Sequence, residues 1–166
     1  MTDQVQRLEI AALSVTGPAH TAARTKDAEA GDLRILLVDD DRGFRSMLRG
    51  WLSDQGISKV VEASDGLEAL DLAARVQPDL VLMDARMPRM SGIEAAERME
   101  EILPGVQIIL LTGYEEEEIK RAGVAAGLYR FFGKDCSPDV LWSAIQQAAK
   151  PGSPGEPGAP EGFPER

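Results

Sequence analysis

Residues 80–92 read LVLMDARMPRMSG, and the organisation of the chain can be built outward from this stretch. Four apolar residues lead without interruption to the carboxylate of Asp84, and a turn that contains Pro88 follows. Apolar runs of this kind are typical of strands covered on both faces, as in parallel sheets. Ser91 and Glu94 have the spacing of a capping box, which predicts that a helix begins here. We therefore interpret Asp84 as a nucleophile at the open end of a buried strand.

The same order of a strand and then a helix recurs five times between residues 32 and 150. Short strands that alternate with helices predict a parallel sheet with right-handed crossovers and helices on both faces. This is a three-layer α-β-α sandwich of the α/β class. The predicted strands are residues 33–38, 57–63, 79–83, 106–111 and 128–132. Apolar residues at helical spacing predict the side chains that face the core, which are Phe44, Met47, Leu48, Trp51, Leu52, Leu67, Leu70, Ala74, Ile93, Ala96, Met99, Val140, Leu141, Ala144, Ile145 and Ala148.

Two flanking segments have compositions that do not support a packed element. Residues 1–31 are rich in Ala, Thr and charged residues, and we expect a disordered N-terminal arm. Residues 151–166 read PGSPGEPGAPEGFPER, which predicts a disordered Pro/Gly-rich tail or a linker. The structured domain is thus predicted at residues 32–150, and no helix-turn-helix or catalytic output domain fits in either flank.

The overall charge and composition exclude several classes of function. The formal net charge is −10 and the pI is about 4.6, which disfavours direct nucleic-acid binding through a broad basic face. Cys136 is the one cysteine, so the chain has neither a disulfide framework nor a thiolate zinc site. No apolar run approaches the roughly 20 residues of a membrane span, and no secretory signal is evident. We expect a cytoplasmic protein with no membrane partner.

Polar residues follow the predicted strands at the points where those strands end. Asp39 and Asp40 follow the first strand, Asp84 the third, Thr112 the fourth and Lys134 the fifth. The carboxyl ends of parallel strands meet at one edge, where ligands bind. Crowded carboxylates favour a divalent cation, above all Mg²⁺. A carboxylate can attack phosphorus to form an acyl phosphate, with a cation and a lysine neutralising charge. A single aspartate after a strand is often a turn residue, but the convergence of these groups favours function.

Four separate motifs resemble the receiver domain of two-component response regulators. They are LLVDDD, LVLMDARMPRMSG, ILLTG and FFGK, and the resemblance extends over residues 33–149. It implies the flavodoxin-like fold of chemotaxis regulators, with a five-stranded parallel sheet in the order 2-1-3-4-5.

The resemblance also implies roles for individual positions. Asp84 would be the phosphoacceptor, and Thr112 and Lys134 would bind the phosphoryl group. Thr112 and Phe131 would form the conformational switch. The implied ligands of Mg²⁺ are Asp39, Asp40, Asp84 and the backbone carbonyl of Arg86.

The implied partners follow from the same family. A sensor histidine kinase or a phosphotransfer protein would donate the phosphoryl group. The output would pass by contact to an unknown downstream protein through the face of helix 4, strand 5 and helix 5, and a weak homodimer is left open. The domain would not be an enzyme beyond its own phosphorylation and dephosphorylation.

Two positions depart from the family pattern. Asp135 follows Lys134, where the family has a proline, and we expect a trans peptide bond because a non-proline cis bond costs about 2.5–4 kcal/mol. Arg86 and Tyr114 occupy the two positions that control access of hydrolytic water in the family. Their bulk predicts slow self-dephosphorylation, and Tyr114→Ala should shorten the phosphoryl lifetime.

Three alternative functions are weighed against this interpretation. A degenerate receiver that binds partners without phosphorylation is favoured only by the missing proline. An aspartyl-phosphate phosphohydrolase of the dehalogenase type carries its nucleophile after the first strand as DxDx[TV], whereas this chain has DDDR there. A flavin or dinucleotide binder needs glycines or hydroxyls in the first turn, where this chain has three acids.

Overall fold

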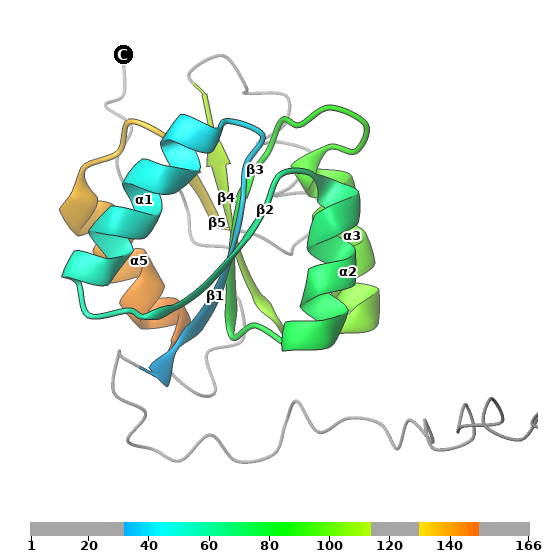
Figure 1. The fold of residues 1–166 in the computed structure, drawn as a ribbon, viewed down its shortest axis with the longest axis horizontal. Helices are drawn as coiled ribbons and strands as arrows, with labels where there is room; N and C mark the ends of the chain where they lie inside the picture. The colour runs from blue at the N-terminus through cyan, green and yellow to red at the C-terminus, as the bar shows by residue number, and fades with distance from the viewer. Residues whose placement is uncertain (1–31, 114–129, 150–166) are drawn as a thin grey trace, which may run out of the picture.

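The central strand β3 (Leu80–Asp84) is buried at every residue, and the rest of the sheet is built around it. It pairs in parallel with β1 on one side and with β4 on the other. The computed structural model describes residues 32–113 and 130–149. Within them the chain forms a three-layer sandwich whose five-stranded parallel sheet has the order β2-β1-β3-β4-β5, as predicted (Figure 1). The other elements are β1 (Arg34–Val38), α1 (Arg42–Asp54), β2 (Lys59–Ala63), α2 (Gly66–Val76), α3 (Gly92–Ile102), β4 (Gln107–Thr112), β5 (Arg130–Gly133) and α5 (Pro138–Ala148).

Two hydrophobic cores lie on opposite faces of the sheet. Alternate residues of each inner strand enter one core or the other, so Val81 and Met83 face α2 and α3 whereas Leu80 and Leu82 face α1 and α5. Figure 1 shows these two pairs of helices on either side of the sheet. A strand that must be apolar on both faces has no polar alternation, and this explains the continuous apolar runs in the sequence.

Local side-chain hydrogen bonds set the beginnings of the helices. Asp41, Asp65, Ser91 and Ser137 are the N-caps of the four described helices, and each accepts from backbone N–H groups of the first turn. At the start of α2, the Glu68 carboxylate also accepts hydrogen bonds from the backbone N–H and the hydroxyl of Ser64.

Several predicted core positions are wrong. Met47 is 60% exposed and Leu67 is 49% exposed, and Val140 and Ala74 are also exposed. In α2 the buried positions are instead Gly66, Ala69 and Ala73. Both sets have helical spacing, and the small side chains let α2 approach the sheet closely.

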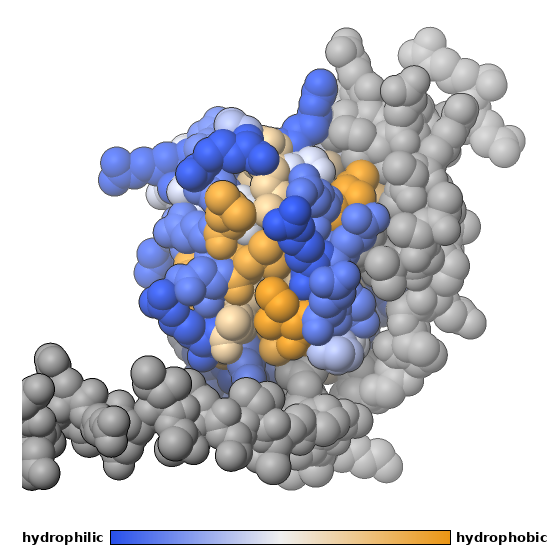
Figure 2. All heavy atoms as spheres, turned by 90° about the vertical axis from the view of Figure 1, so that its right-hand side faces the viewer, coloured by the Kyte–Doolittle hydropathy of each residue, from blue (hydrophilic) through white to orange (hydrophobic). Residues whose placement is uncertain are grey.

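The outer surface of the α2–α3 side is mixed. Hydrophobic side chains lie there among hydrophilic ones (Figure 2), and the exposed Leu67 and Ile102 belong to these two helices. In the described ranges no helix is long and apolar enough to cross a membrane. The predicted arm at 1–31, the tail at 151–166 and the predicted helix after β4 lie outside the described residues.

Candidate functional site

The carboxyl ends of four strands place the predicted polar residues at one edge of the sheet. Asp39 follows β1, Asp84 ends β3, Thr112 ends β4 and Lys134 follows β5. The parallel registers align these ends, because Asp84 is opposite Leu111 and Thr112 is opposite Gly133. The fold therefore brings together groups that are up to 95 residues apart in the sequence, from Asp39 to Lys134.

Three aspartates form an acidic cluster at this edge. Carboxylate oxygens of Asp39, Asp40 and Asp84 all lie within 4.8 Å of one another. Asp39 and Asp84 are buried, whereas Asp40 is exposed to solvent. One oxygen of Asp39 accepts the backbone N–H of Asp41 at 2.8 Å, and one oxygen of Asp84 accepts the backbone N–H of Arg86 at 3.1 Å. These bonds orient both buried carboxylates and leave the second oxygen of each directed at the other groups of the site.

Lys134 supplies positive charge to both buried carboxylates. Its ammonium donates to Asp84 Oδ2 at 3.0 Å and lies 2.8 Å from Asp39 Oδ2 without hydrogen-bonding geometry. Its backbone N–H donates to the Thr112 carbonyl at 2.8 Å, which fixes the residue to β4. Burial lowers the pKa of Lys134, but the two carboxylates outweigh it and raise the pKa above its ordinary value.

The surroundings of Asp84 raise its pKa above the ordinary carboxyl value. Burial raises the pKa of Asp84, and the hydrogen bonds from Arg86 and Lys134 reduce that rise without cancelling it. The neighbouring negative charge of Asp39 also raises it. A buried carboxylate with a raised pKa at the open end of a sheet has the properties of a functional group.

Thr112 has a hydroxyl for which the described residues offer no partner. The residue is fully buried, and its Oγ1 makes no hydrogen bond within that part of the chain. Buried hydroxyls are normally paired, so an unpaired one beside a charged site needs an explanation. Phe131 is half-buried and lies on the same face of the sheet as Thr112. Leu110 and Thr112 are two residues apart in β4 and so share a face, and Phe131 is the partner of Leu110 in β5.

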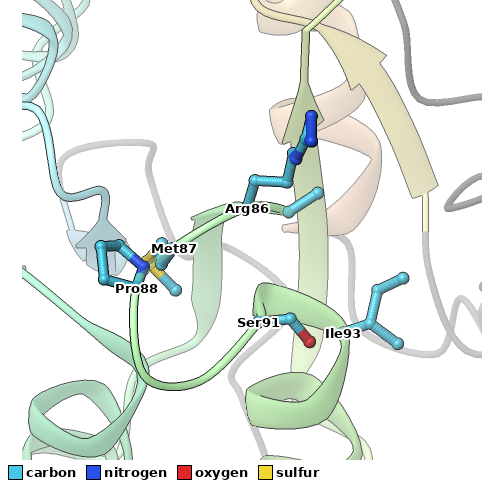
Figure 3. Close-up of a pocket in the computed structure, with 6 residues that line it drawn as sticks. Arg86, Met87, Pro88, Ser91 and Ile93 are labelled. Carbon is cyan, nitrogen blue, oxygen red and sulfur yellow. The ribbon is translucent and has the colours of Figure 1, made fainter.

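The loop between β3 and α3 begins directly after Asp84 and is tied to it by the Arg86 N–H. It contains Arg86, which is exposed to solvent. Figure 3 shows Arg86, Met87 and Pro88 on this loop, with Ser91 and Ile93 at the start of α3. Together with Ala85 these residues line a cavity of about 380 Å³. The role of the Arg86 carbonyl as a metal ligand stays a prediction.

Two residues of α1 that sequence reasoning missed also support the site. The ring centroid of Phe44 lies 4.7 Å from the Lys134 ammonium, and Arg45 donates to the backbone carbonyl of Asp39 at 2.6 Å. Arg45 also pairs with Glu62 of β2 at 3.3 Å. Spacing on α1 gave no signal for either role, since Phe44 reads as a core residue and Arg45 as a surface charge.

The remaining predictions about the loop after β5 can be compared directly. The Lys134–Asp135 peptide bond is trans, as predicted. Burial raises the pKa of the nearby Cys136 thiol, which disfavours its reactive thiolate form. Tyr114 lies outside the described residues.

A parallel sheet in this order, with three aspartates, a threonine and a lysine at its carboxyl edge, is the architecture of a phosphorylation-dependent signalling domain. The chain belongs to the response regulator receiver domain family, whose sequence profile matches residues 35–146. It is thus a receiver domain of two-component signalling, and this membership disfavours the phosphohydrolase and flavin-binding alternatives.

Individual relatives agree with this assignment. The chain is 38% identical over 122 residues to the transcriptional regulatory protein YxjL of Bacillus subtilis (strain 168), across 71% of this chain and 55% of that protein. It is 33% identical over 114 residues to sporulation initiation phosphotransferase F of the same organism, across 69% of this chain and 91% of that protein. The solved structure of the Vibrio cholerae chemotaxis protein CheY4 is similar, with 30% identity, a TM-score of 0.63, and coverage of 70% of this chain and 98% of that chain. The chain therefore spans about half the length of YxjL.

Proposed function

We propose that this domain accepts a phosphoryl group on Asp84 from a phosphohistidine of a sensor kinase or a phosphotransfer protein. The observation that carries the proposal is the position of the Asp84 carboxylate, which is 5% exposed, held by Lys134 at 3.0 Å and adjacent to two further aspartates. The hydroxyl of Thr112 at the end of the next strand, which has no partner within residues 32–113 and 130–149, supports it.

The donor set fits a hard divalent cation. Three carboxylates with oxygens within 4.8 Å of one another are the ligands that Mg²⁺ prefers, and within the described ranges the cluster consists of carboxylates alone. Asp39, Asp40 and Asp84 would hold the ion, with the Arg86 carbonyl as the ligand that the family resemblance implies. A bound Mg²⁺ supplies positive charge that offsets the repulsion between an anionic nucleophile and an anionic phosphoryl group.

The residues of this chain then have distinct roles in the transfer. An oxygen of Asp84 forms a bond to phosphorus while the bond from phosphorus to the histidine nitrogen breaks. The electron pair of that bond stays on the imidazole, which takes up a proton. Lys134 neutralises charge on the phosphoryl group, and the Thr112 hydroxyl donates to one of its oxygens. Because only the ionised Asp84 is nucleophilic, the positive charge of Lys134 also keeps it in its reactive form.

The same contact would drive signalling. A phosphoryl oxygen that accepts from Thr112 draws the end of β4 toward Asp84, and Phe131 on the same face of the sheet responds to that movement. This is a two-state equilibrium that phosphorylation biases through differential contacts. The output surface is predicted at helix 4, β5 and α5, of which helix 4 lies outside the described residues. Cytoplasmic location, the downstream partner and a weak homodimer remain predictions.

The test is chemical labelling with a small phosphodonor. The protein is incubated with Mg²⁺ and acetyl phosphate, and intact mass is measured for wild type, Asp84→Asn and the control Asp71→Asn, an exposed aspartate of α2. We expect one phosphoryl increment in wild type and in Asp71→Asn, and none in Asp84→Asn. Labelling that survives Asp84→Asn would contradict the site assignment.

A degenerate receiver is the second candidate. The observation in its favour is Asp135 in the position of the family's proline, next to the lysine that the chemistry needs. This alternative predicts that wild type binds Mg²⁺ and yet gains no phosphoryl group from acetyl phosphate.

A further inference from the structure

We propose that Arg89 is a positioning residue of the site, whose ion pair with Asp65 holds the β3–α3 loop in place for cation binding. The part that concerns the cation rests on the proposed function. The ion-pair partner of Arg89 is Asp65, which does not belong to the acidic cluster. Arg89 therefore acts on the site through the loop that carries Arg86.

The backbone of Arg89 is the first observation. Its φ is +69°, in the left-handed region that side chains with a Cβ rarely adopt. Gln77, at +46°, is the other non-glycine residue with positive φ in the described ranges, and its conformation is that of the C-cap of α2. Arg89 ends no helix, so its conformation must be maintained by contacts that the side chain or its neighbours make.

The partner of Arg89 distinguishes this ion pair from the others on the surface. The Arg89 guanidinium pairs with Oδ2 of Asp65, whose side chain is only 9% exposed. The other oxygen of Asp65 caps α2 by accepting the backbone N–H groups of Leu67 at 2.9 Å and Glu68 at 3.0 Å. One buried carboxylate therefore joins the start of α2 to the loop. Without Arg89, the second oxygen of Asp65 would lose its positively charged partner.

An exposed ion pair would carry no such role. The Arg75–Asp71 pair of α2 joins two side chains that are both well exposed, and pairs of that kind contribute little. Arg89 is exposed as well, but its carboxylate partner is buried and fixed by two backbone hydrogen bonds. The ion pair thus connects the loop to a rigid group.

Two further contacts attach the β3–α3 loop to its surroundings. A Cβ on Gly66 would lie 2.9 Å from Met90 Sδ, so Met90 is seated directly on the first residue of α2. At the other side of the loop, the Gly92 N–H donates to the Ala85 carbonyl at 2.9 Å. Arg86 lies between these attachments, immediately after Ala85. These two attachments restrict the position of Arg86 in the loop. Loss of the ion pair between Arg89 and Asp65 would relax that restriction.

The experiment uses a double-mutant cycle on the full chain. Asp65→Asn keeps an N-cap acceptor of equal quality but removes the charge. Arg89→Asn removes the charge while tolerating the left-handed backbone. Arg75→Gln is the control, since it removes one positive charge from α2 outside the site. Mg²⁺ affinity is measured by titration, and hydrogen exchange of the Gly92 and Ala85 amides is measured without Mg²⁺.

We expect each single variant to weaken Mg²⁺ binding by about 10-fold, the lower end of what the loss of outer-shell partners costs, and to accelerate exchange at Gly92. The double variant should be no weaker than either single one, and Arg75→Gln should match wild type. Unchanged affinity in the single variants, or additive losses in the double variant, would overturn the proposal.

Mg²⁺ binding by the wild type tests the proposed cation site separately from the role of Arg89. If wild type binds no Mg²⁺, the proposed cation site is wrong, and hydrogen exchange alone decides the positioning role. Faster exchange at Gly92 in both Asp65→Asn and Arg89→Asn supports the ion pair as the element that holds the loop. Exchange equal to wild type at Gly92 in these variants overturns it. Amides of β3 serve as the control for global folding in each variant.

Discussion

Replacement of Thr112 by valine should stabilise the domain while impairing its chemistry. Thr112 is fully buried at the end of β4, and its hydroxyl has no partner in the described residues. A buried hydroxyl without a partner costs about 1–3 kcal/mol, and valine removes it with little change of shape at a strand position. We expect Thr112→Val to increase the free energy of unfolding by about 1 kcal/mol, or the Tm by about 3–6 °C.

Thr112→Val should have the opposite effect on phosphorylation. If the hydroxyl donates to the phosphoryl group, its loss should slow labelling by acetyl phosphate at least about 10-fold. Thr112→Ser is the matched control, because it keeps the hydroxyl and loses a methyl group. It should destabilise the domain by about 1 kcal/mol and keep the wild-type labelling rate. Urea unfolding and intact mass measure the two quantities. A destabilised Thr112→Val, or one labelled at the wild-type rate, would refute the reasoning.

Further predictions concern packing, protonation and the cation. Gly92→Ala should destabilise by about 2 kcal/mol or more in urea unfolding, because a Cβ would collide with the Asp84 carbonyl oxygen and lie 2.9 Å from Ala85 Cα. Gly50→Ala in α1, where a Cβ meets nothing within 4 Å, should instead stabilise by about 0.5–1 kcal/mol. The raised pKa of Asp84 means that its contribution to stability is complete below the ordinary carboxyl pKa and is lost as pH rises through the raised value. In EDTA, Asp84→Asn should therefore be more stable than wild type at pH 7, with the difference shrinking below about pH 4; a constant difference across this range would contradict the shift. Mg²⁺ at about 100 times its Kd should raise the free energy of unfolding by about 2.7 kcal/mol, and Asp39→Asn should remove most of this increase in a thermal scan.

The continuous apolar runs determined much of the architecture in advance. Leu80 to Met83 and Ile108 to Leu111 are apolar at every position, which only a strand covered on both faces requires. The helix start at Ser91 was equally visible, since a short polar side chain at a helix start acts through local hydrogen bonds.

The helix faces were harder to predict than the strands. Leu67 and Ala74 were predicted to face the core, whereas Gly66, Ala69 and Ala73 are the buried residues of α2. Both sets satisfy the same period. The choice between them depends on how closely the helix lies against the sheet, and the seating of Met90 on Gly66 belongs to that tertiary packing.

The sequence by itself determined which residues meet at the carboxyl edge, because strand ends in a parallel sheet are fixed by the order of the apolar runs. Asp39, Asp84, Thr112 and Lys134 were all identified in that way. Only the tertiary structure decided their physical state: the Lys134 ammonium lies close to both buried carboxylates, and the Thr112 hydroxyl is left unpaired in the described residues. The pairing of Arg89 with Asp65 likewise joins two helix–loop junctions. Distances between side chains on different elements depend on register and packing, which no local pattern in the chain records.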